Sequence, residues 1–353
     1  MKAIVVQRPN ELAVVDVPMP ILGPYDALVK SDIAFICNAT DRKLVQGGFP
    51  GIGPESYPLL LGHENVGTVI DYGTKVTSFQ EGDRVIGGLV LQTLGGKYHS
   101  GWGGFCEFTV VTDYQAMAKD IEEAGKTLTL SEDAQIMRKV PASISLEAAG
   151  LLCTWREVYA GMFTDFSFKP GQDLIIFGCG PVGLSFIKFA RLMGMGTVIG
   201  VDFLPSKRKR ALQAGADLVL EPDETSIQEI KRLFPNGIDA VVDAVGNNSI
   251  IEQAVSLVRM GGSICVYGVL GAEEIRFNKS LGPYNFNLLV HQWPTRSAEA
   301  QAQEPLIQWI EENRLVADEF VTGRYSIANF EEAYTASQQV ESIKTLVDFS
   351  AWH

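Results

Sequence analysis

The 353-residue sequence has no long hydrophobic run and few cysteines, and its acidic residues outnumber its basic ones. No apolar stretch approaches the roughly 18–20 residues of a membrane-spanning helix. The first residues also lack the apolar core and cleavage site of a secretory signal, so we expect a cytoplasmic protein without membrane partners. Acidic residues outnumber basic ones by 42 to 29, which argues against binding to nucleic acid. A disulfide framework is not expected, because the five cysteines are odd in number and scattered: Cys37, Cys106, Cys153, Cys179 and Cys265.

The chain is long enough for two domains at about 100–200 residues each. Residues 1–156 hold short β-branched segments separated by turn residues, which predicts a β-rich domain. Residues 157–293 alternate apolar strands with helix-length segments, which predicts a parallel sheet covered by helices on both faces. The last strand candidate, Thr345–Phe349, lies too far downstream for that sheet. We therefore expect an α/β protein in which residues 294–353 return to the first domain.

A glycine-rich segment, GCGPVG at 178–183, directly follows a predicted strand and opens a predicted helix. This order predicts a dinucleotide site, in which one glycine forms the tight turn, one admits the pyrophosphate and one packs the helix on the sheet. The start of the helix favours an anion, because its N–H groups are unpaired there. The predicted cofactor contacts in this segment are Gly178, Gly180, Pro181, Val182 and Gly183.

The second predicted strand of this domain ends at Asp202. A carboxylate there is placed to accept hydrogen bonds from the adenosine ribose and repels a 2′-phosphate, so NAD is favoured over NADP. The basic run from Lys207 to Arg210 has two interpretations. It is either a solvated helix face or a site for a 2′-phosphate. Lys207 is also a candidate contact to the ribose.

The segment GHENVG at 62–67, followed by Gly73, Val76 and GDRV at 82–85, resembles the zinc-dependent medium-chain alcohol and polyol dehydrogenases of the sorbitol, glucose and threonine dehydrogenase type. The resemblance covers nearly the whole chain. It implies a groES-like β-rich domain that carries zinc, a Rossmann domain that binds NAD, and a homo-oligomer of two or four chains. It also places two further cofactor contacts after the fourth and fifth strands, Val245 and Val269.

Carried over residue by residue, the resemblance implies that Cys37, His63 and Cys153 bind zinc. Two thiolates and an imidazole neutralise the ion and leave one tetrahedral position open. Glu64 is either a fourth ligand that leaves when substrate arrives or a carboxylate beside the ligands. Asp41 matches the aspartate that hydrogen-bonds the zinc histidine. Without the resemblance, the two cysteines would be interpreted as small buried hydrophobic residues.

Two features depart from the family pattern. The run CNATD at 37–41 has one residue more between cysteine and threonine than the family has, so either the loop bulges or the cysteine shifts. The four cysteines of the family's second, structural zinc lobe, expected after about Gly87, are missing. The sequence therefore predicts one zinc ion per chain.

The resemblance implies hydride transfer from an alcohol carbon to NAD, with zinc lowering the pKa of the substrate hydroxyl. The predicted catalytic residues are Thr40, as the first hydroxyl of a proton relay, Asp41 and Glu64. The family's histidine two positions after the aspartate is replaced by Lys43. A mainly polar set near the zinc-bearing segments favours a polyol or sugar over an apolar alcohol. This set consists of Asn38, Arg42, Lys43, Glu64, Trp155, Arg156 and Glu157.

Other functions stay open on the sequence alone. A simple alcohol dehydrogenase would share every motif. A zinc-free quinone or enone reductase would keep the glycine loop but lack the three zinc ligands together. A lyase or epimerase would hold NAD tightly and release no NADH. A non-catalytic NAD-binding protein would have no reason to retain the ligands. A substrate screen followed at the NADH absorbance distinguishes these functions.

Overall fold

The computed structural model describes residues 1–125, 131–271 and 274–353, which form two compact units. Unit 1 consists of Met1–Thr154 and Gln303–His353, and unit 2 of Trp155–Ala302. The boundaries predicted from the sequence, 156/157 and 293/294, therefore differ from these by two and nine residues. Residues 294–302 include α8 (Arg296–Gln301), whose buried Glu299 lies 3.5 Å from Arg156 of the same unit. No helix of the described ranges is both long and apolar enough to cross a membrane.

Unit 1 is built from two β-sheets. The larger sheet has the strand order β16-β17-β3-β5-β6-β9, with β8 also paired to β3, and the smaller has the order β2-β1-β4-β7. The strands of the larger sheet are β3 (Asp26–Ile36), β5 (Glu64–Tyr72), β6 (Arg84–Ile86), β8 (Phe108–Thr112), β9 (Arg138–Lys139), β16 (Val321–Ser326) and β17 (Lys344–Asp348). Those of the smaller sheet are β1 (Lys2–Arg8), β2 (Glu11–Asp16), β4 (Leu59–Leu60) and β7 (His99–Ser100). Its helices are α1 (Thr40–Gln46), α2 (Tyr114–Glu123), α9 (Gln303–Glu311), α10 (Phe330–Ser337) and the first part of α3 (Leu146–Ala160).

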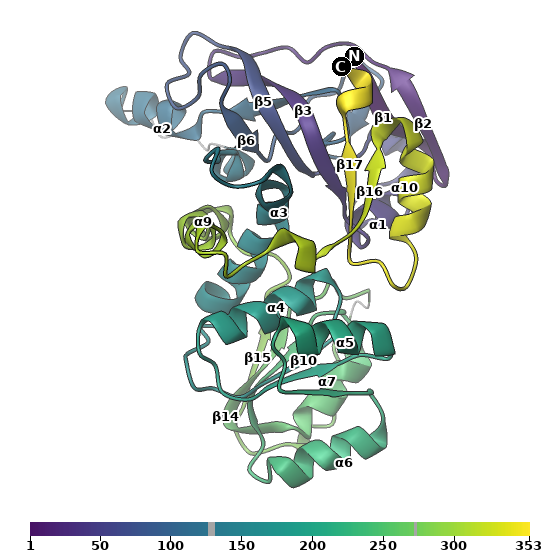
Figure 1. Ribbon diagram of the computed structural model, residues 1–353, viewed down its shortest axis with the longest axis vertical. Coiled ribbons are helices and arrows are strands. Elements are labelled where there is room, and N and C mark those ends of the chain that lie inside the picture. Colours follow the sequence, from purple (N-terminus) through teal and green to yellow (C-terminus); the bar gives the residue numbers. More distant parts are fainter. Residues whose placement is uncertain (126–130, 272–273) are drawn as a thin grey trace. The chain divides into compact units, whose positions relative to one another are not determined.

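The last strand of the chain pairs with the first domain, which confirms the placement predicted for it. β17 runs antiparallel to β3, with Thr345 opposite Ile36. Figure 1 shows this yellow strand beside the purple β3. Val347 is fully buried in the same apolar cluster as Ile36 and Phe330. Burial of these side chains holds the C-terminal segment in place, at about 25 cal/mol per Å² of apolar surface.

Unit 2 is a parallel sheet with the strand order β12-β11-β10-β13-β14-β15. Its strands are β10 (Leu174–Phe177), β11 (Val198–Val201), β12 (Leu218–Leu220), β13 (Ile238–Asp243), β14 (Val258–Val266) and β15 (Asn287–Val290). Its further helices are α4 (Pro181–Leu192), α5 (Pro205–Ala214), α6 (Glu224–Leu233) and α7 (Asn248–Val255).

Helices cover both faces of this sheet. On one face, Ile230 of α6 and Ile251 of α7 pack in one cluster with Val241 of β13. On the other face, a Cβ placed on Gly200 of β11 would lie 3.2 Å from Ala211 of α5. Covered faces explain why the strands are apolar along their whole length, as parallel strands between helix layers require. The predicted combination of a β-rich domain with a doubly wound parallel-sheet domain is confirmed.

Candidate zinc and dinucleotide sites

Three side chains with metal-binding atoms meet in unit 1. The donor atoms of Cys37, His63 and Glu64 all lie within 4.8 Å of one another, and this is the only such group in the described ranges. Cys37 directly follows β3, and His63 and Glu64 lie at the start of β5. These strands are antiparallel neighbours with Phe35 opposite Glu64, so the end of one meets the start of the other. The register of the sheet thus brings the two motifs together.

Asp41 shapes the loop that carries Cys37. Its Oδ2 accepts a hydrogen bond of 2.9 Å from the Cys37 backbone N–H, and its own N–H donates to the Cys37 carbonyl oxygen at 3.0 Å. The extra residue of this loop is accommodated in a turn at 38–39, and Cys37 remains beside His63. The side chain of Asp41 therefore stabilises the longer loop from within.

Asp41 also faces the imidazole of His63. Its Oδ1 lies 3.4 Å from His63 Nδ1, and both atoms are buried without a hydrogen-bond partner. Burial lowers the pKa of His63, but the nearby side chains of Asp41 and Cys37 outweigh this effect and raise the pKa well above 6.5. The surroundings thus favour a positive charge at the imidazole. Since Nδ1 faces Asp41, Nε2 is left for a metal ion, which fits a zinc histidine oriented by a carboxylate.

Glu64 is held by a buried lysine that the sequence analysis did not identify. Nζ of Lys344, in β17, donates to Glu64 Oε1 at 2.7 Å and to Oε2 at 2.5 Å. The two side chains are only 3% and 6% exposed, so this is a buried ion pair. Thr154 of α3 donates a further hydrogen bond to Oε1 at 3.2 Å. The one available signal was a charged lysine at the head of the last strand, KTLVD, two residues before its apolar pair Leu346 and Val347.

Two other predicted residues lie on elements that border this group. Cys153 is buried in α3 and directly precedes Thr154, but it is outside the set of donors within 4.8 Å. Thr40 begins α1, one residue before Asp41. Cys37, His63, Glu64 and Asp41 are thus brought together by direct contacts, whereas the roles of Cys153 and Thr40 stay predictions.

The polar set predicted to face the substrate needs correction. Trp155 and Arg156 are fully buried, and Arg156 forms an ion pair with the buried Glu299. Side chains without exposed surface do not contact a substrate. Sequence position near Cys153 was the reason for including them, but successive residues of a helix point in different directions.

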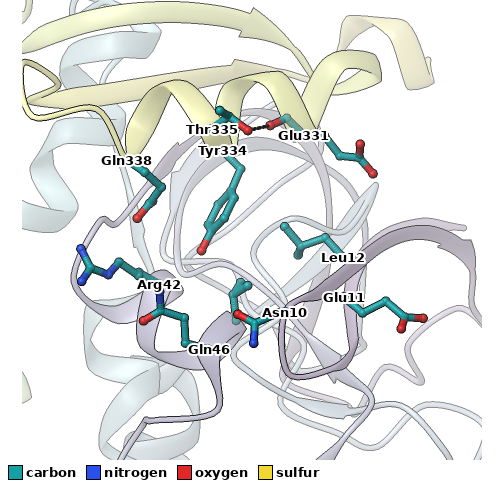
Figure 2. A pocket seen from close by; sticks show the side chains of 10 residues that line it. Asn10, Glu11, Leu12, Arg42, Gln46, Glu331, Tyr334, Thr335 and Gln338 are labelled. Atoms are coloured by element: carbon teal, nitrogen blue, oxygen red, sulfur yellow. Dashed lines mark hydrogen bonds between the residues drawn. The ribbon is translucent and has the colours of Figure 1, made fainter.

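Arg42 lies on a different surface of unit 1. It lines a hollow of about 600 Å³ between the turn joining β1 to β2, α1 and α10. Figure 2 shows Arg42, Gln46 and Gln338 on one side of Tyr334. The Tyr334 side chain projects from α10 into the hollow. None of the three metal-binding candidates lines this hollow. Arg42 therefore belongs to the outer face of α1, and the prediction that it faces the substrate is not supported.

The glycine loop of unit 2 has the steric features that a pyrophosphate site needs. Gly178 has a φ of +91°, which favours glycine. A Cβ on Gly183 would lie 1.7 Å from the Gly178 carbonyl oxygen, so α4 crosses the strand end at a distance only glycine permits. A Cβ on Gly180 would meet nothing within 4 Å. Gly180 is the N-cap of α4 and no side chain caps the helix, so open space lies before free N–H groups that suit a phosphate.

Asp202 follows β11 and links the second strand to the glycine loop. Its Oδ2 accepts a hydrogen bond of 2.8 Å from Cys179 N–H, and its Oδ1 accepts one of 2.9 Å from Leu204 N–H. Each oxygen retains a lone pair for a ribose hydroxyl. Burial and Asp202 raise the pKa of the Cys179 thiol to about 12, against the opposing charge of Lys207. Cys179 is therefore an unreactive buried thiol beside the loop.

Of the basic run, Arg208 is already engaged within the domain. Its guanidinium donates to the backbone carbonyl oxygens of Asp202 and Phe203 and pairs with Glu221 at 2.6 Å. This residue thus closes the turn after β11. The charges of both Lys207 and Arg208 act on the glycine loop, since each lowers the pKa of Cys179.

The loops after β10, β13 and β14 meet at the carboxyl edge of the sheet. A Cβ on Gly178 would lie 2.5 Å from Val245, and a Cβ on Gly246 would lie 2.5 Å from the Val269 carbonyl oxygen. Val245 and Val269 are 54% and 39% exposed, which is high for valine. Asp243 stabilises the loop after β13, because its Oδ1 accepts hydrogen bonds from two N–H groups of that loop. The predicted cofactor contacts thus line one edge, where parallel sheets bind dinucleotides.

Family models match both parts of the chain. Residues 23–121 match the alcohol dehydrogenase GroES-like domain, and residues 181–310 match the zinc-binding dehydrogenase family. An alcohol dehydrogenase from Rhizobium meliloti is 31% identical over 274 residues, which cover 76% of each chain. The chain belongs to the zinc-dependent medium-chain alcohol and polyol dehydrogenases.

Further relatives fall in the same family. A probable D-xylulose reductase A from Aspergillus clavatus is 31% identical over 279 residues, 74% of this chain and 73% of that one. The crystal structure of 2R,3R-butanediol dehydrogenase from Bacillus subtilis has the same fold, with a TM-score of 0.80 over 99% of both chains at 20% identity. This dehydrogenase is therefore an oxidoreductase that acts on CH–OH groups with zinc and a nicotinamide dinucleotide.

The two glycines of the loop provide a matched pair of variants. Gly180→Ala adds a methyl group in open space, so we expect the melting temperature to change by less than about 2 °C. The same methyl intrudes on the pyrophosphate and should raise the Kd for NAD+ about tenfold or more. Gly183→Ala should lower the free energy of unfolding by about 1–3 kcal/mol through its clash with Gly178. Thermal unfolding and NAD+ titration check both. Wild-type NAD+ affinity in Gly180→Ala would contradict this assignment.

The buried ion pair predicts a large effect on stability. Lys344→Met leaves Glu64 buried and unpaired, which should lower the free energy of unfolding by about 3–5 kcal/mol. The double variant Glu64→Gln with Lys344→Met should recover at least half of the loss, because no charge then remains. Lys139→Met is the control, since Lys139 is half exposed in its pair with Asp83, and it should cost about 1 kcal/mol or less. Urea unfolding measures all three, and a double variant as unstable as the single one would refute the explanation.

Proposed function

We propose that this dehydrogenase oxidises a hydroxyl group of a polyol or sugar with NAD at one zinc ion. The observation that supports it most directly is the buried group of Cys37, His63 and Glu64, with the charge of Glu64 balanced by Lys344. The proposed metal ligands are Cys37, His63 and Cys153, and Glu64 lies within reach as an exchangeable fourth ligand. A zinc-free quinone or enone reductase would have no need for this charge-balanced set of donors.

Each residue around the proposed zinc ion would have a separate role. Zinc, when bound, supplies the Lewis acidity that lowers the pKa of the substrate hydroxyl. Asp41 holds His63 with Nδ1 toward itself and so fixes which nitrogen is offered to the metal. Lys344 and Thr154 hold the carboxylate of Glu64. The hydroxyl of Thr40, one residue from Asp41, would relay the proton released from the substrate, accepting it while passing its own proton on toward water.

A polyol or sugar is the proposed substrate class. The name of the Aspergillus clavatus relative, a probable D-xylulose reductase, supports it. Of the predicted polar set, Asn38 and Lys43 lie in the same unit as the metal-binding group, and we propose them as contacts to substrate hydroxyls. A pocket that hydrogen-bonds hydroxyls discriminates strongly against analogues that lack them, because its own polar groups would be left unpaired.

Steady-state kinetics with sorbitol, xylitol, glucose, 1-butanol and benzyl alcohol test the substrate class. A C5 or C6 polyol or aldose should exceed 1-butanol in kcat/KM by about 10²-fold or more. Equal turnover of 1-butanol or benzyl alcohol would favour the simple alcohol dehydrogenase instead. Tight NAD binding without net NADH formation on any of these compounds would favour a lyase or epimerase.

Zinc analysis of alanine variants tests the ligand set. Cys37→Ala and Cys153→Ala should each lose most of the zinc, because each removes a thiolate that neutralises the ion. Cys265→Ala is the control, since this cysteine is fully buried in β14 and burial raises its pKa well above the usual value. It should retain about one zinc per chain. Full zinc content in Cys153→Ala, or about two zinc ions in the unmodified protein, would be incompatible with the proposal.

Cofactor choice follows from Asp202. We propose NAD as the physiological cofactor for two reasons. The Asp202 carboxylate lies beside the glycine loop, where the adenosine ribose would bind, and Arg208 already donates to a backbone carbonyl oxygen. Asp202→Asn should raise kcat/KM with NADP relative to NAD about tenfold, through loss of repulsion toward the 2′-phosphate. Measurement of kcat/KM with both cofactors decides it. A preference for NADP in the unmodified enzyme would mean that the basic run after β11 prevails.

We also propose a homo-oligomer of two or four chains. Within the described part of unit 2, β15 is an edge strand that pairs with β14 alone. Exposed apolar side chains lie on or near it, including Val290 at 45% and Tyr284 at 87%. An exposed edge strand of this kind is a ready surface for pairing with a second copy. Sedimentation of the purified protein gives the number of chains.

A further inference from the structure

Unit 2 contains a carboxylate and an imidazole that the sites described above do not use. Oδ1 of Asp165 lies 3.7 Å from Nδ1 of His291. Asp165 ends a short helical segment, Gly161–Asp165, and its side chain is only 12% exposed. Its other oxygen, Oδ2, is buried without a hydrogen-bond partner. Such an incompletely paired buried carboxylate is costly and calls for an explanation.

The pair lies at the carboxyl ends of β14 and β15. His291 directly follows β15, and its backbone N–H donates to the Val266 carbonyl oxygen at the end of β14 at 3.0 Å. The ring of Phe166 packs against the imidazole, with 5.8 Å between the ring centroids. The neighbouring Gln292 donates to the Gly268 carbonyl oxygen at 3.0 Å, next to Val269. His291 thus shares its edge of the sheet with the proposed cofactor contacts.

The position along this edge indicates which end of the cofactor is nearby. In a doubly wound sheet the dinucleotide extends across the carboxyl edge, with its adenosine on the half where the second strand ends in an acid. That half is β10 to β12, marked by Asp202. The half formed by β13, β14 and β15 is therefore left for the nicotinamide. His291, with 41% of its side chain exposed, lies on this half.

The charge of the pair matters because the nicotinamide changes charge in the reaction. The ring is positive in NAD+ and neutral in NADH. Burial raises the pKa of Asp165, and the charge of His291 lowers it. The Asp165 side chain is only 12% exposed, so water screens its negative charge less than that of a surface carboxylate, and it attracts a nearby cation more strongly. The facing Nδ1 also fixes the imidazole so that Nε2 points away from Asp165.

We propose that His291 contacts the nicotinamide half of the cofactor and that Asp165 is a positioning residue whose charge favours NAD+ over NADH. This inference rests on the proposed NAD site. The buried carboxylate is thus explained as a permanent counter-charge to the oxidised ring.

The test is equilibrium binding of NAD+ and NADH to the zinc-loaded protein without substrate. In Asp165→Asn, the ratio of Kd for NAD+ to Kd for NADH should rise about fivefold or more, because an attraction specific to the oxidised form is removed. Glu252→Gln removes an equal charge from an exposed position of the same unit and should leave the ratio unchanged. A purely structural role of Asp165 would raise both constants in parallel. A parallel rise or an unchanged ratio overturns the proposal.

Two His291 variants keep the test decisive if Asp165→Asn does not fold. His291→Lys sets a lasting positive charge against Asp165 and should raise the ratio in the same direction. His291→Gln keeps the charge of Asp165, so both constants should rise together while their ratio stays within about twofold. Unchanged constants in His291→Gln would remove His291 from the contact and overturn the proposal. Failure of the unmodified protein to bind either form would instead refute the proposed NAD site itself.

Discussion

The buried ion pair between Glu64 and Lys344 joins two parts of the chain that are 280 residues apart. A carboxylate at 5% exposure is tolerated only when a partner balances its charge. The partner here is the first residue of β17, and β17 reaches it by pairing with β3, which directly precedes Cys37. The discontinuous course of unit 1 is thus tied to the electrostatics of its metal site. The last strand supplies both an apolar layer and the counter-charge.

This balance also explains how a reactive group of donors is kept in a folded protein before metal binds. Asp41 holds the cysteine loop by two hydrogen bonds and faces the imidazole of His63. Lys344 neutralises the charge of Glu64 in a buried ion pair. The groups that remain available to a metal ion are the sulfur of Cys37, one imidazole nitrogen of His63 and the carboxylate of Glu64. Zinc accepts donors of these three kinds. The nucleotide site in unit 2 follows the opposite principle, since it depends on open space at Gly180 and on backbone N–H groups.

Local rules predicted much of this arrangement. The glycine loop could be interpreted from sequence because its constraints are short-range; only glycine fits where a Cβ on Gly183 would lie 1.7 Å from a backbone oxygen. Lys344 escaped prediction because its partner is distant in sequence. Arg156 was misjudged because its buried partner, Glu299, lies on another helix.

The central claim is that one zinc ion is bound by sulfur, nitrogen and oxygen donors together. X-ray absorption spectroscopy at the zinc edge of the zinc-loaded protein tests it directly, because it counts the neighbours of the ion by element and distance. The account predicts two sulfur neighbours at about 2.3 Å and two nitrogen or oxygen neighbours at about 2.0–2.2 Å. A shell of four sulfur atoms, or one of only nitrogen and oxygen, would contradict it.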